Sequence, residues 1–564
     1  MEKVVAIGIQ DFEKIIKNDV FYIDKTHFIK EWWEAHDEVT LITRPRRFGK
    51  TLNINMLDYF FSNKHANRSD LFEGLSIWED EKFRNLQGTY PVISLSFASI
   101  KETNYPDTER QICEILKKLY IKNNFLRDSH VLIDADRIFF DHMLSANVER
   151  IHAVNALHNL SDYLCRYYGK KVIILLDEYD TPMQEAYVHG FWDELVSFTR
   201  NLFNSTFKTN PYLEKGLMTG ITRVSKESIF SDLNNLKVIT TTSDEYATSF
   251  GFTEEEVFRA LDNYGMGAEK DTVKHWYDGF TFGSHTDIYN PWSVLNLLDT
   301  KRYNTYWANT SSNGLVSKLL RQGHADLKST FEDLLDGKSI RCIIDEQIVY
   351  NQLDDNEEAI WSLMLASGYL KVLSYDRADL LEEGELVKYE LTLTNYEVKL
   401  MLLHMVKDWF KATSPNYNAF IKALLNDDLD AMNDYMNEIT LAIFSYFDVG
   451  SNTKRSQTEK FYHGFVLGLM VELQDRYYIT SNRESGFGRY DVVLEPRKPD
   501  LDAIILEFKV FNERREKTLE DTVAVALQQI EDKQYAASLI AKGIPKENIR
   551  KYGFAFDGKI VLIG

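Results

Sequence analysis

The chain has 564 residues, of which 44% are hydrophobic and 27% charged, and this length predicts about two to four domains rather than a single core. A net charge of −21 argues against promiscuous binding to nucleic acid, although a focused basic channel could still bind it. The three cysteines form no Cys-x-x-Cys pair. The sequence has no apolar run near the ~20 residues that span a bilayer and shows no signal peptide. These observations predict a cytoplasmic protein without a membrane partner.

The first informative segment is Arg44-Pro45-Arg46-Arg47-Phe48-Gly49-Lys50-Thr51, which lies between a predicted strand at 39–42 and a predicted helix at 52–61. Such a loop turns backbone N–H groups and a helix N-terminus toward a polyphosphate. Lys50 would reach the β- and γ-phosphates of ATP, and the Thr51 hydroxyl would help to hold Mg²⁺. Arg44 stands where the usual pattern has glycine, so Arg44 and Pro45 must make the tight turn in another way. The alternative is a basic surface loop.

A second segment, Val172–Leu176, is a continuous apolar run that ends at Asp177 and Glu178. This pattern is typical of a parallel strand buried on both faces, and open α/β sheets bind ligands at the carboxyl ends of such strands. Asp177 would bind the waters of Mg²⁺, and Glu178 would orient or deprotonate the attacking water, with Asp180 as the next candidate base. A core strand without function is the alternative for this segment alone, but the two segments together predict an ATP–Mg²⁺ site.

The loop at 44–51, preceded by Tyr22-Ile23-Asp24-Lys25-Thr26, resembles a family of bacterial and archaeal proteins with an AAA-ATPase-like domain and a C-terminal PD-(D/E)XK nuclease-like domain. Further matching segments are Thr219–Arg223 with Ser228–Leu236, Trp276–Phe280 and Tyr289–Ser293. In this family arginine is the expected residue at position 44. The resemblance covers nearly the whole chain and implies the architecture, but it implies no substrate. Arg223, at the end of the strand after Asp177, is a candidate sensor of the γ-phosphate.

Residues 1–285 alternate short apolar runs with helical patterns, which predicts a parallel sheet covered by helices. The predicted strands are 39–42, 92–97, 172–176 and 216–221, and the helices between them include 107–120 and 193–204. Two further helical segments, 254–264 and 273–277, predict a small lid, and the resemblance implies that this lid closes over the nucleotide. We therefore expect a P-loop α/β domain with a helical lid.

Residues 286–450 are mainly helical in pattern. A helix at 358–367, followed by 368–373 and a strand at 388–393, resembles a winged-helix arrangement. The acidic segment Asp354–Glu358 suits a helix N-terminus and does not suit contact with DNA. This favours a role in protein or interdomain contacts over DNA reading.

Residues 451–564 predict the order αβββαβ of a PD-(D/E)XK nuclease core, with helices at 457–473 and 519–540 and strands at 478–482, 489–494, 503–510 and 553–556. Residues two apart in a strand share a face, so Glu507 and Lys509 point the same way, and Asp491 on the neighbouring strand can join them. Asp491 and Glu507 would hold Mg²⁺ or Mn²⁺, and Lys509 would orient water and neutralise developing charge. A solvated strand face is the alternative, but buried charges are costly unless they are paired or bind a metal.

Two helical residues enter the predicted nuclease site through the resemblance. Glu459 is similar to the family's first acidic residue and could add a metal ligand through water, although an exposed helix position would explain it as well. Gln529 is similar to the polar residue that supports the site, and Lys533 and Tyr535 are further candidates.

These features predict a nucleotide-regulated, metal-dependent nuclease that acts on DNA rather than RNA, with ATP binding or hydrolysis gating the nuclease domain, in genome defence or mobile-element biology. The alternative is an ATP-dependent signalling switch whose C-terminal domain binds nucleic acid or protein without cleavage, which the acidic composition favours. A DNA motor is a third hypothesis, disfavoured because no helicase motif set accompanies the nucleotide segments. A homo-oligomer and a protein activator both remain open.

Overall fold

The computed structural model describes residues 3–222, 229–230, 232–307, 314–322, 325–345, 359–377, 381, 385–408, 414–443, 466, 470, 473, 476–481, 484–485, 488–489, 492–498, 501–557 and 560–564. The chain divides into two compact units. The first comprises residues 1–311, 342–389 and 394–397, and the second comprises residues 312–341, 390–393 and 398–564. The domain boundaries expected near residues 285 and 450 stay predictions.

The first unit is built on a parallel sheet with the strand order β2-β3-β4-β1-β5. Its strands are β1 (Val39–Thr43), β2 (Val92–Ser96), β3 (Val172–Asp177), β4 (Leu213–Gly220) and β5 (Leu236–Ile239). Every residue of β1 and β3 is buried, as expected for central parallel strands. Because β4 lies between β1 and β3, the carboxyl ends of these three strands meet at one edge of the sheet.

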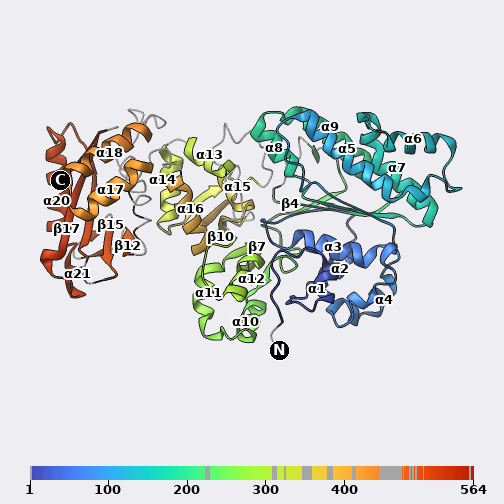
Figure 1. Ribbon diagram of the computed structural model, residues 1–564, viewed down its shortest axis with the longest axis horizontal. Helices are drawn as coiled ribbons and strands as arrows, with labels where there is room; N and C mark the ends of the chain where they lie inside the picture. The colour runs from blue at the N-terminus through green and yellow to red at the C-terminus, as the bar shows by residue number, and fades with distance from the viewer. Residues whose placement is uncertain are drawn as a thin grey trace. The chain divides into compact units, whose positions relative to one another are not determined.

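Helices cover both faces of this sheet (Figure 1), which confirms the predicted parallel α/β architecture. One face carries α1 (Phe12–Lys17), α2 (His27–Glu34) and α3 (Lys50–Phe61), with α4 (Glu81–Leu86) beyond them. The other face carries α5 (Tyr105–Lys122), α6 (Asp134–Leu144), α7 (Arg150–Tyr168), α8 (Thr181–His189) and α9 (Trp192–Phe207). The sequence patterns at 107–120 and 193–204 lie within α5 and α9, so these two predicted helices are confirmed.

A small subdomain follows the sheet along the chain. It contains β6 (Phe252–Thr253), α10 (Glu254–Asn263), α11 (Lys270–Tyr277), β7 (Phe280–Phe282), β8 (His285–Tyr289) and α12 (Pro291–Thr300), with the strands in the order β6-β8-β7. A capping box between Thr253 and Glu256 starts α10. Val257, Tyr277 and Leu297 belong to one buried cluster that joins the three helices. The two helices predicted for the lid are therefore present as α10 and α11.

The middle of the chain contains α13 (Gly314–Gln322), α14 (Ala325–Leu335), β9 (Ile340–Ile343), α15 (Ala359–Ala366), β10 (Leu370–Tyr375), β11 (Lys388–Leu393) and α16 (Tyr396–Asp408). Its strands form a sheet in the order β10-β11-β9. The predicted succession of a helix and two strands is present as α15, β10 and β11. The acidic segment Asp354–Glu358 lies outside the described residues.

The second unit is built on a mixed sheet with the strand order β12-β15-β16-β17-β18. Its strands are β12 (Tyr477–Ser481), β15 (Val492–Pro496), β16 (Ala503–Val510), β17 (Ile549–Asp557) and β18 (Ile560–Ile563), and β13 (Glu484–Ser485) pairs separately with β14 (Gly488–Arg489). Only β16 and β17 pair in parallel; the other neighbours in the five-stranded sheet are antiparallel. The central strand β16 is buried from Ala503 to Phe508, so Glu507 lies in the interior of the unit.

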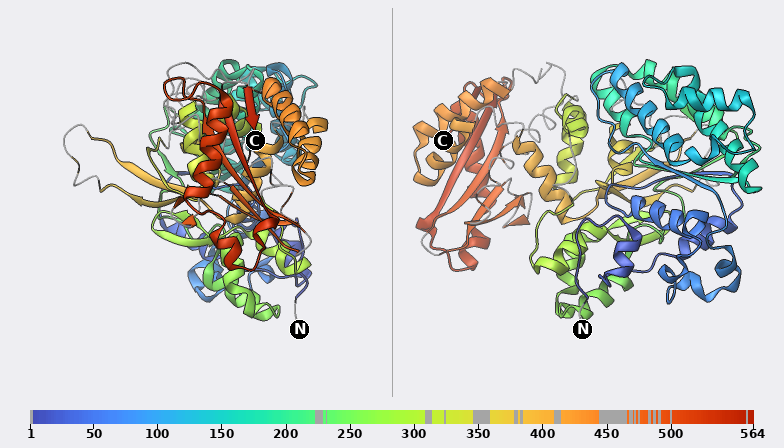
Figure 2. Two further views of the ribbon diagram at one scale, coloured as in Figure 1. Left: turned by 90° about the vertical axis from the view of Figure 1, so that its left-hand side faces the viewer. Right: turned by 45° about the vertical axis from the view of Figure 1, so that its right-hand side comes forward.

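Helices α17 (Ser414–Asn426), α18 (Leu429–Ile443), α20 (Leu519–Asp532) and α21 (Ala537–Ala541) accompany this sheet (Figure 2). α20 packs on β16 and β17, and α18 runs along the edge strand β18. The side-chain amides of Asn433 and Asn437 bond to the backbone of Ile563 and Val561. These bonds occupy backbone groups that an edge strand would otherwise leave open to another chain.

One helix differs from its prediction. The sequence pattern favours a single helix at 519–540, but the structure ends α20 at Asp532 and begins α21 at Ala537. Between them Gln534 adopts a left-handed backbone conformation with φ of 52°, which a continuous helix of L-residues does not accommodate. No helix among the described residues combines the length and the hydropathy that crossing a lipid bilayer requires.

Candidate functional site

The loop between β1 and α3 has the backbone of a phosphate-binding turn. Gly49 precedes α3 with φ of 84°, and Arg47 has φ of 64°. Two residues of the loop therefore adopt the left-handed backbone conformation before the helix starts. The ammonium Nζ of Lys50 donates to the carbonyl oxygens of Arg44 and Pro45, both at 2.8 Å. Burial lowers the pKa of Lys50. The lysine is therefore folded back over its own loop.

Arg44 supports this loop from within the protein. Its guanidinium donates to the carbonyl oxygens of Thr43 (2.9 Å), Thr240 (2.6 Å) and Glu245 (3.2 Å), lies 4.4 Å from the ring centre of Phe282, and is fully buried. Burial lowers the pKa of Arg44 to about 9. The place of Arg44 in the nucleotide-binding set stays a prediction; in the structure its guanidinium is bonded to backbone carbonyls. It braces the turn that a glycine makes in the usual pattern.

Thr51 and Asp177 meet, as the sequence predicts for the two parts of a magnesium site. The Thr51 hydroxyl donates to Asp177 Oδ2 at 2.7 Å, and the Thr219 hydroxyl donates to Asp177 Oδ1 at 2.6 Å. Burial raises the pKa of Asp177. Sequence reasoning missed Thr219, although a threonine at the end of an otherwise apolar strand could have indicated it.

The two acids after Asp177 have different surroundings. Glu178 is half-buried, has φ of 49° and accepts a hydrogen bond from the Thr181 hydroxyl at 3.2 Å. Asp180 is buried, and its Oδ2 accepts from the backbone N–H groups of Ile221 and Thr222, both at 2.9 Å. Asp180 thus holds the chain that leaves β4. Glu178 as the base, with Asp180 as the next candidate, stays a prediction.

The remaining loop residues contact the small subdomain. The Phe48 ring lies 4.7 Å from that of Phe280, and the Arg47 guanidinium lies 4.3 Å from the ring centre of Trp292. The carbonyl oxygen of Arg46 accepts hydrogen bonds from Trp307 Nε1 at 2.9 Å and from Asn290 Nδ2 at 3.3 Å. Residues of the predicted lid subdomain therefore contact the phosphate-binding loop at Arg46, Arg47 and Phe48.

A cavity of about 300 Å³ opens beside the Thr51–Asp177 pair. Ser94 and Ser96 of β2 and Lys118 of α5 line it together with this pair. The space next to the candidate magnesium ligands is thus lined by polar groups together with the apolar side chains of Ile54, Leu95, Ile115 and Leu119. Arg223, the predicted γ-phosphate sensor, lies outside the described residues.

In the second unit, Glu507 and Lys509 lie side by side on β16. Glu507 is 1% exposed, and the Lys509 ammonium lies 3.0 Å from its Oε1. The side-chain amide of Gln529 on α20 also donates to Glu507 Oε1, and it lies 3.0 Å from the Tyr535 hydroxyl. The structure therefore joins Glu507, Lys509 and Gln529, and it places the further candidate Tyr535 beside Gln529. Asp491 and Glu459 lie outside the described residues.

A glycine lets α20 approach this group. Gly553 of β17 pairs with Glu507 of β16, and a Cβ atom at Gly553 would lie 2.9 Å from the carbonyl oxygen of Val523 and 3.0 Å from the Ala526 Cβ. The close contact between helix and sheet brings Gln529 within hydrogen-bonding distance of Glu507. The carboxylate of Glu507 and the ammonium of Lys509 lie on the central strand, and the amide of Gln529 reaches them from α20. Such a group suits the binding of a hard cation next to a phosphate.

Two family models match the chain at these places. Residues 6–230 match the family described as a predicted AAA-ATPase, and residues 457–564 match the PD-(D/E)XK nuclease superfamily. The chain combines an AAA-ATPase-like domain with a PD-(D/E)XK nuclease superfamily domain. It is also 26% identical over 556 residues to an "uncharacterized protein in vnfD 5'region" of Azotobacter chroococcum mcd 1, covering 96% of this chain and 95% of that protein. The two families suggest ATPase and nuclease activity.

A segment that carries the resemblance, 22–26, lies outside the phosphate loop of the AAA-ATPase-like domain. Lys25 is buried and forms an ion pair with Glu256 at 2.7 Å, and it donates to the carbonyl oxygen of Thr248 at 2.9 Å. Asp24 accepts from the backbone N–H groups of Thr26 and Ser76. This segment therefore ties the start of the domain to α10 and is structural.

Proposed function

We propose that the protein is a nucleotide-regulated, metal-dependent nuclease, in which the AAA-ATPase-like domain binds ATP and controls phosphodiester hydrolysis by the C-terminal domain. The observation that carries this proposal is the pair of buried Glu507 and half-buried Lys509 on the central strand of a PD-(D/E)XK domain, with Gln529 of α20 donating to Glu507. A buried carboxylate is costly unless it is paired or binds a metal. The Lys509 ammonium beside Glu507 could balance negative charge that develops on a phosphate.

In the ATP half of the proposal, Lys50 would exchange the carbonyl oxygens of Arg44 and Pro45 for the β- and γ-phosphate oxygens. Thr51 and Asp177 would hold Mg²⁺, which neutralises phosphate charge when bound. Glu178 would orient or deprotonate the attacking water, and Arg223 would contact the γ-phosphate. Pro45, Arg46, Arg47, Phe48 and Gly49 would supply the turn and its backbone N–H groups.

In the nuclease half, Glu507 and Asp491 would hold Mg²⁺ or Mn²⁺, and Glu459 would add a ligand through water. The metal, when bound, lowers the pKa of water and stabilises charge on the scissile phosphate. Lys509 would orient the attacking water and balance the developing negative charge. Gln529 would fix the carboxylate of Glu507, because its amide donates to Oε1.

A chain of contacts in the first unit supports the gating part of this proposal. The Arg46 carbonyl accepts from Trp307 Nε1, and the backbone N–H of Trp307 donates to Glu397 Oε1 at 2.7 Å. Glu397 lies in the first turn of α16, a helix that continues into the second unit. A nucleotide that shifts the loop at Arg46 would therefore act on the start of a helix shared by both units.

The test is incubation of the purified chain with single- and double-stranded DNA and RNA, with Mg²⁺ or Mn²⁺, and with or without ATP. We expect cleavage that needs a metal and changes with ATP. DNA as the preferred substrate and a role in genome defence stay predictions that this panel and a phage-infection assay address. No cleavage under any condition would favour the signalling switch, which the net charge of −21 supports.

A further inference from the structure

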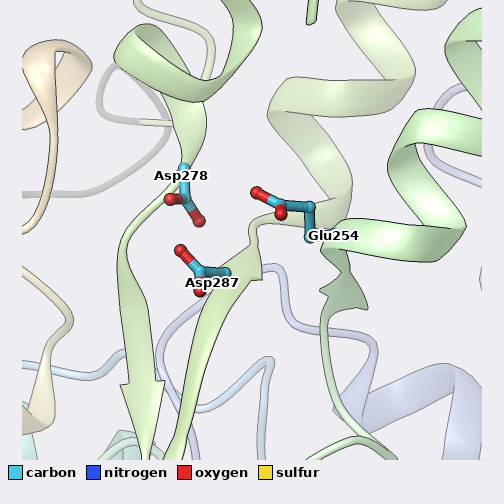
Figure 3. A group of neighbouring side chains, drawn as sticks. All are labelled: Glu254, Asp278 and Asp287. Atoms are coloured by element: carbon cyan, nitrogen blue, oxygen red, sulfur yellow. The ribbon is translucent and has the colours of Figure 1, made fainter. Parts of the chain in front are cut away.

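Three carboxylates converge in the small subdomain (Figure 3), and none of them belongs to the two sites described above. Glu254 is the first residue of α10, Asp278 directly follows α11, and Asp287 lies on β8. One oxygen atom from each carboxylate lies within 4.8 Å of the other two. Like charges at this distance repel, so the fold must hold these groups together at a cost.

One cation faces the three carboxylates. The Lys274 ammonium contacts Glu254 Oε2 and lies 3.2 Å from Asp287 Oδ1 and 3.9 Å from Asp278 Oδ2. The hydroxyl of Tyr289 also donates to Glu254 Oε2, at 3.3 Å. One ammonium against three carboxylates leaves an excess of negative charge. The Lys274 side chain is 42% exposed, so it can move into solvent.

Asp278 supplies a separate indication of a ligand. The residue is 7% exposed, and among the described residues its Oδ1 has no hydrogen-bond partner. In Figure 3 its carboxylate points toward those of Asp287 and Glu254. A buried carboxylate oxygen without a donor is costly unless a cation binds it.

We propose that Glu254, Asp278 and Asp287 form a third divalent-cation site, separate from the two metal positions of the proposed function. Its ligands are carboxylate oxygens alone, the set that hard cations such as Ca²⁺ and Mg²⁺ prefer. The cation binds Asp278 Oδ1 and takes the place of the Lys274 ammonium, which moves outward. The site joins α10 to the hairpin of β7 and β8, whose Phe280 packs on Phe48 of the phosphate loop.

The probe is Tb³⁺, whose luminescence is sensitised by a nearby tyrosine; Tyr289 is bonded to one of the ligands. The experiment uses the full chain with Asp177→Asn and Glu507→Ala and without nucleotide, so that the other two metal positions are removed. We expect one saturable Tb³⁺ site per chain. Displacement by Ca²⁺ or Mg²⁺ then identifies the preferred cation.

In this background Asp278→Asn should weaken Tb³⁺ binding about tenfold or more, because one of three anionic ligands is lost. Asp271→Asn, an exposed acid of α11, the helix that Asp278 directly follows, is the matched control and should change nothing. Lys274→Met should strengthen binding, since it removes the competing ammonium. Circular dichroism checks that each variant is folded.

Glu254→Gln is the second ligand variant if Asp278→Asn does not fold, and it should weaken binding in the same way. The proposal is overturned if the background chain binds no Tb³⁺, or if a folded ligand variant binds it as the background chain does. It is also overturned if Lys274→Met folds without gaining affinity, because the three carboxylates would then serve only to hold the lysine.

Discussion

In the AAA-ATPase-like domain Lys50 donates to two backbone carbonyl oxygens, whereas in the nuclease superfamily domain Lys509 lies 3.0 Å from the carboxylate of Glu507. The carbonyl oxygens carry only partial charge, so a phosphate can displace them from Lys50 at little cost. The carboxylate carries a full charge and shares a strand face with Lys509. We therefore expect Lys50 to exchange its carbonyl partners for phosphate, and Lys509 to remain beside Glu507.

The same contrast holds for what surrounds each lysine. The loop of Lys50 is enclosed by side chains distant in sequence, such as Asn290 and Trp307 on the Arg46 carbonyl. Glu507 and Lys509 lie on one continuous strand, and Gln529 reaches them from the helix packed on it. We therefore expect the nucleotide site to transmit changes and the nuclease site to remain in one geometry.

The largest expected effect is the loss of ATP binding in Lys50→Ala. The variant lacks the charge that would pair with the β- and γ-phosphates, so binding should fall below detection by isothermal titration calorimetry. Lys82→Ala, an exposed lysine paired with Glu34, is the control and should bind as the unaltered chain does. Unchanged affinity in Lys50→Ala would remove the nucleotide assignment.

Glu507→Ala and Asp491→Ala should each abolish cleavage, because each removes a proposed metal ligand. ATP hydrolysis should continue in both variants, since the two sites lie in different domains. The measurement pairs a nuclease gel assay with phosphate release from ATP. Loss of both activities together would show that the variants disturb folding, whereas full cleavage would end the assignment of these ligands.

Glu178→Gln should bind ATP normally but hydrolyse it about 10²–10⁴-fold more slowly, since a positioned general base typically contributes this much. Asp180→Asn provides the contrast. It weakens the hydrogen bonds to Ile221 and Thr222, so its first effect should be a lower melting temperature. Hydrolysis at the normal rate in Glu178→Gln would mean that this residue is not the base.

Lys509→Ala should reduce cleavage about 10²–10³-fold, the usual loss for one contact made in the transition state. Metal binding, followed by Mn²⁺ titration, should persist because an ammonium is not a ligand for a hard cation. Lys542→Ala, an exposed lysine paired with Glu495, is the matched control. Loss of metal binding together with cleavage would assign Lys509 a role in holding Glu507 instead.

The smallest expected effect is on the dependence of the cleavage rate on ATP. Trp307→Phe keeps an aromatic ring but removes the hydrogen bond to the Arg46 carbonyl, worth about 1 kcal/mol. We expect the ratio of cleavage rates with and without ATP to move toward one by about fivefold, while ATP affinity changes less. Trp78→Phe, a tryptophan stacked on Phe72, serves as the control. An unchanged ratio would exclude this route between the two domains.

Local patterns predicted the inner strands of both five-stranded sheets. The apolar runs at β1 and β3 and the alternation on β16 depend on neighbouring residues alone, so sequence could assign them. The patterns missed β5 and β18, because such short strands leave little periodic signal. They joined α20 to α21, because a single left-handed residue, Gln534, interrupts the helical pattern without a visible signal. They also could not show that the Arg44 guanidinium bonds to backbone carbonyls, because the pattern shows a basic loop but not where each guanidinium points.

The sequence by itself determined that a loop ending in Lys50 and Thr51 joins a strand to a helix, and that Glu507 and Lys509 share one face of a strand. Both follow from chain geometry over a few residues. Only the tertiary structure decided that β4 lies between β1 and β3, which brings Thr219 to Asp177. It also decided that Trp307 bonds to Arg46 and that Glu254 meets Asp278 and Asp287. Such contacts join residues far apart in the chain, and packing of the whole domain selects them rather than any local periodicity.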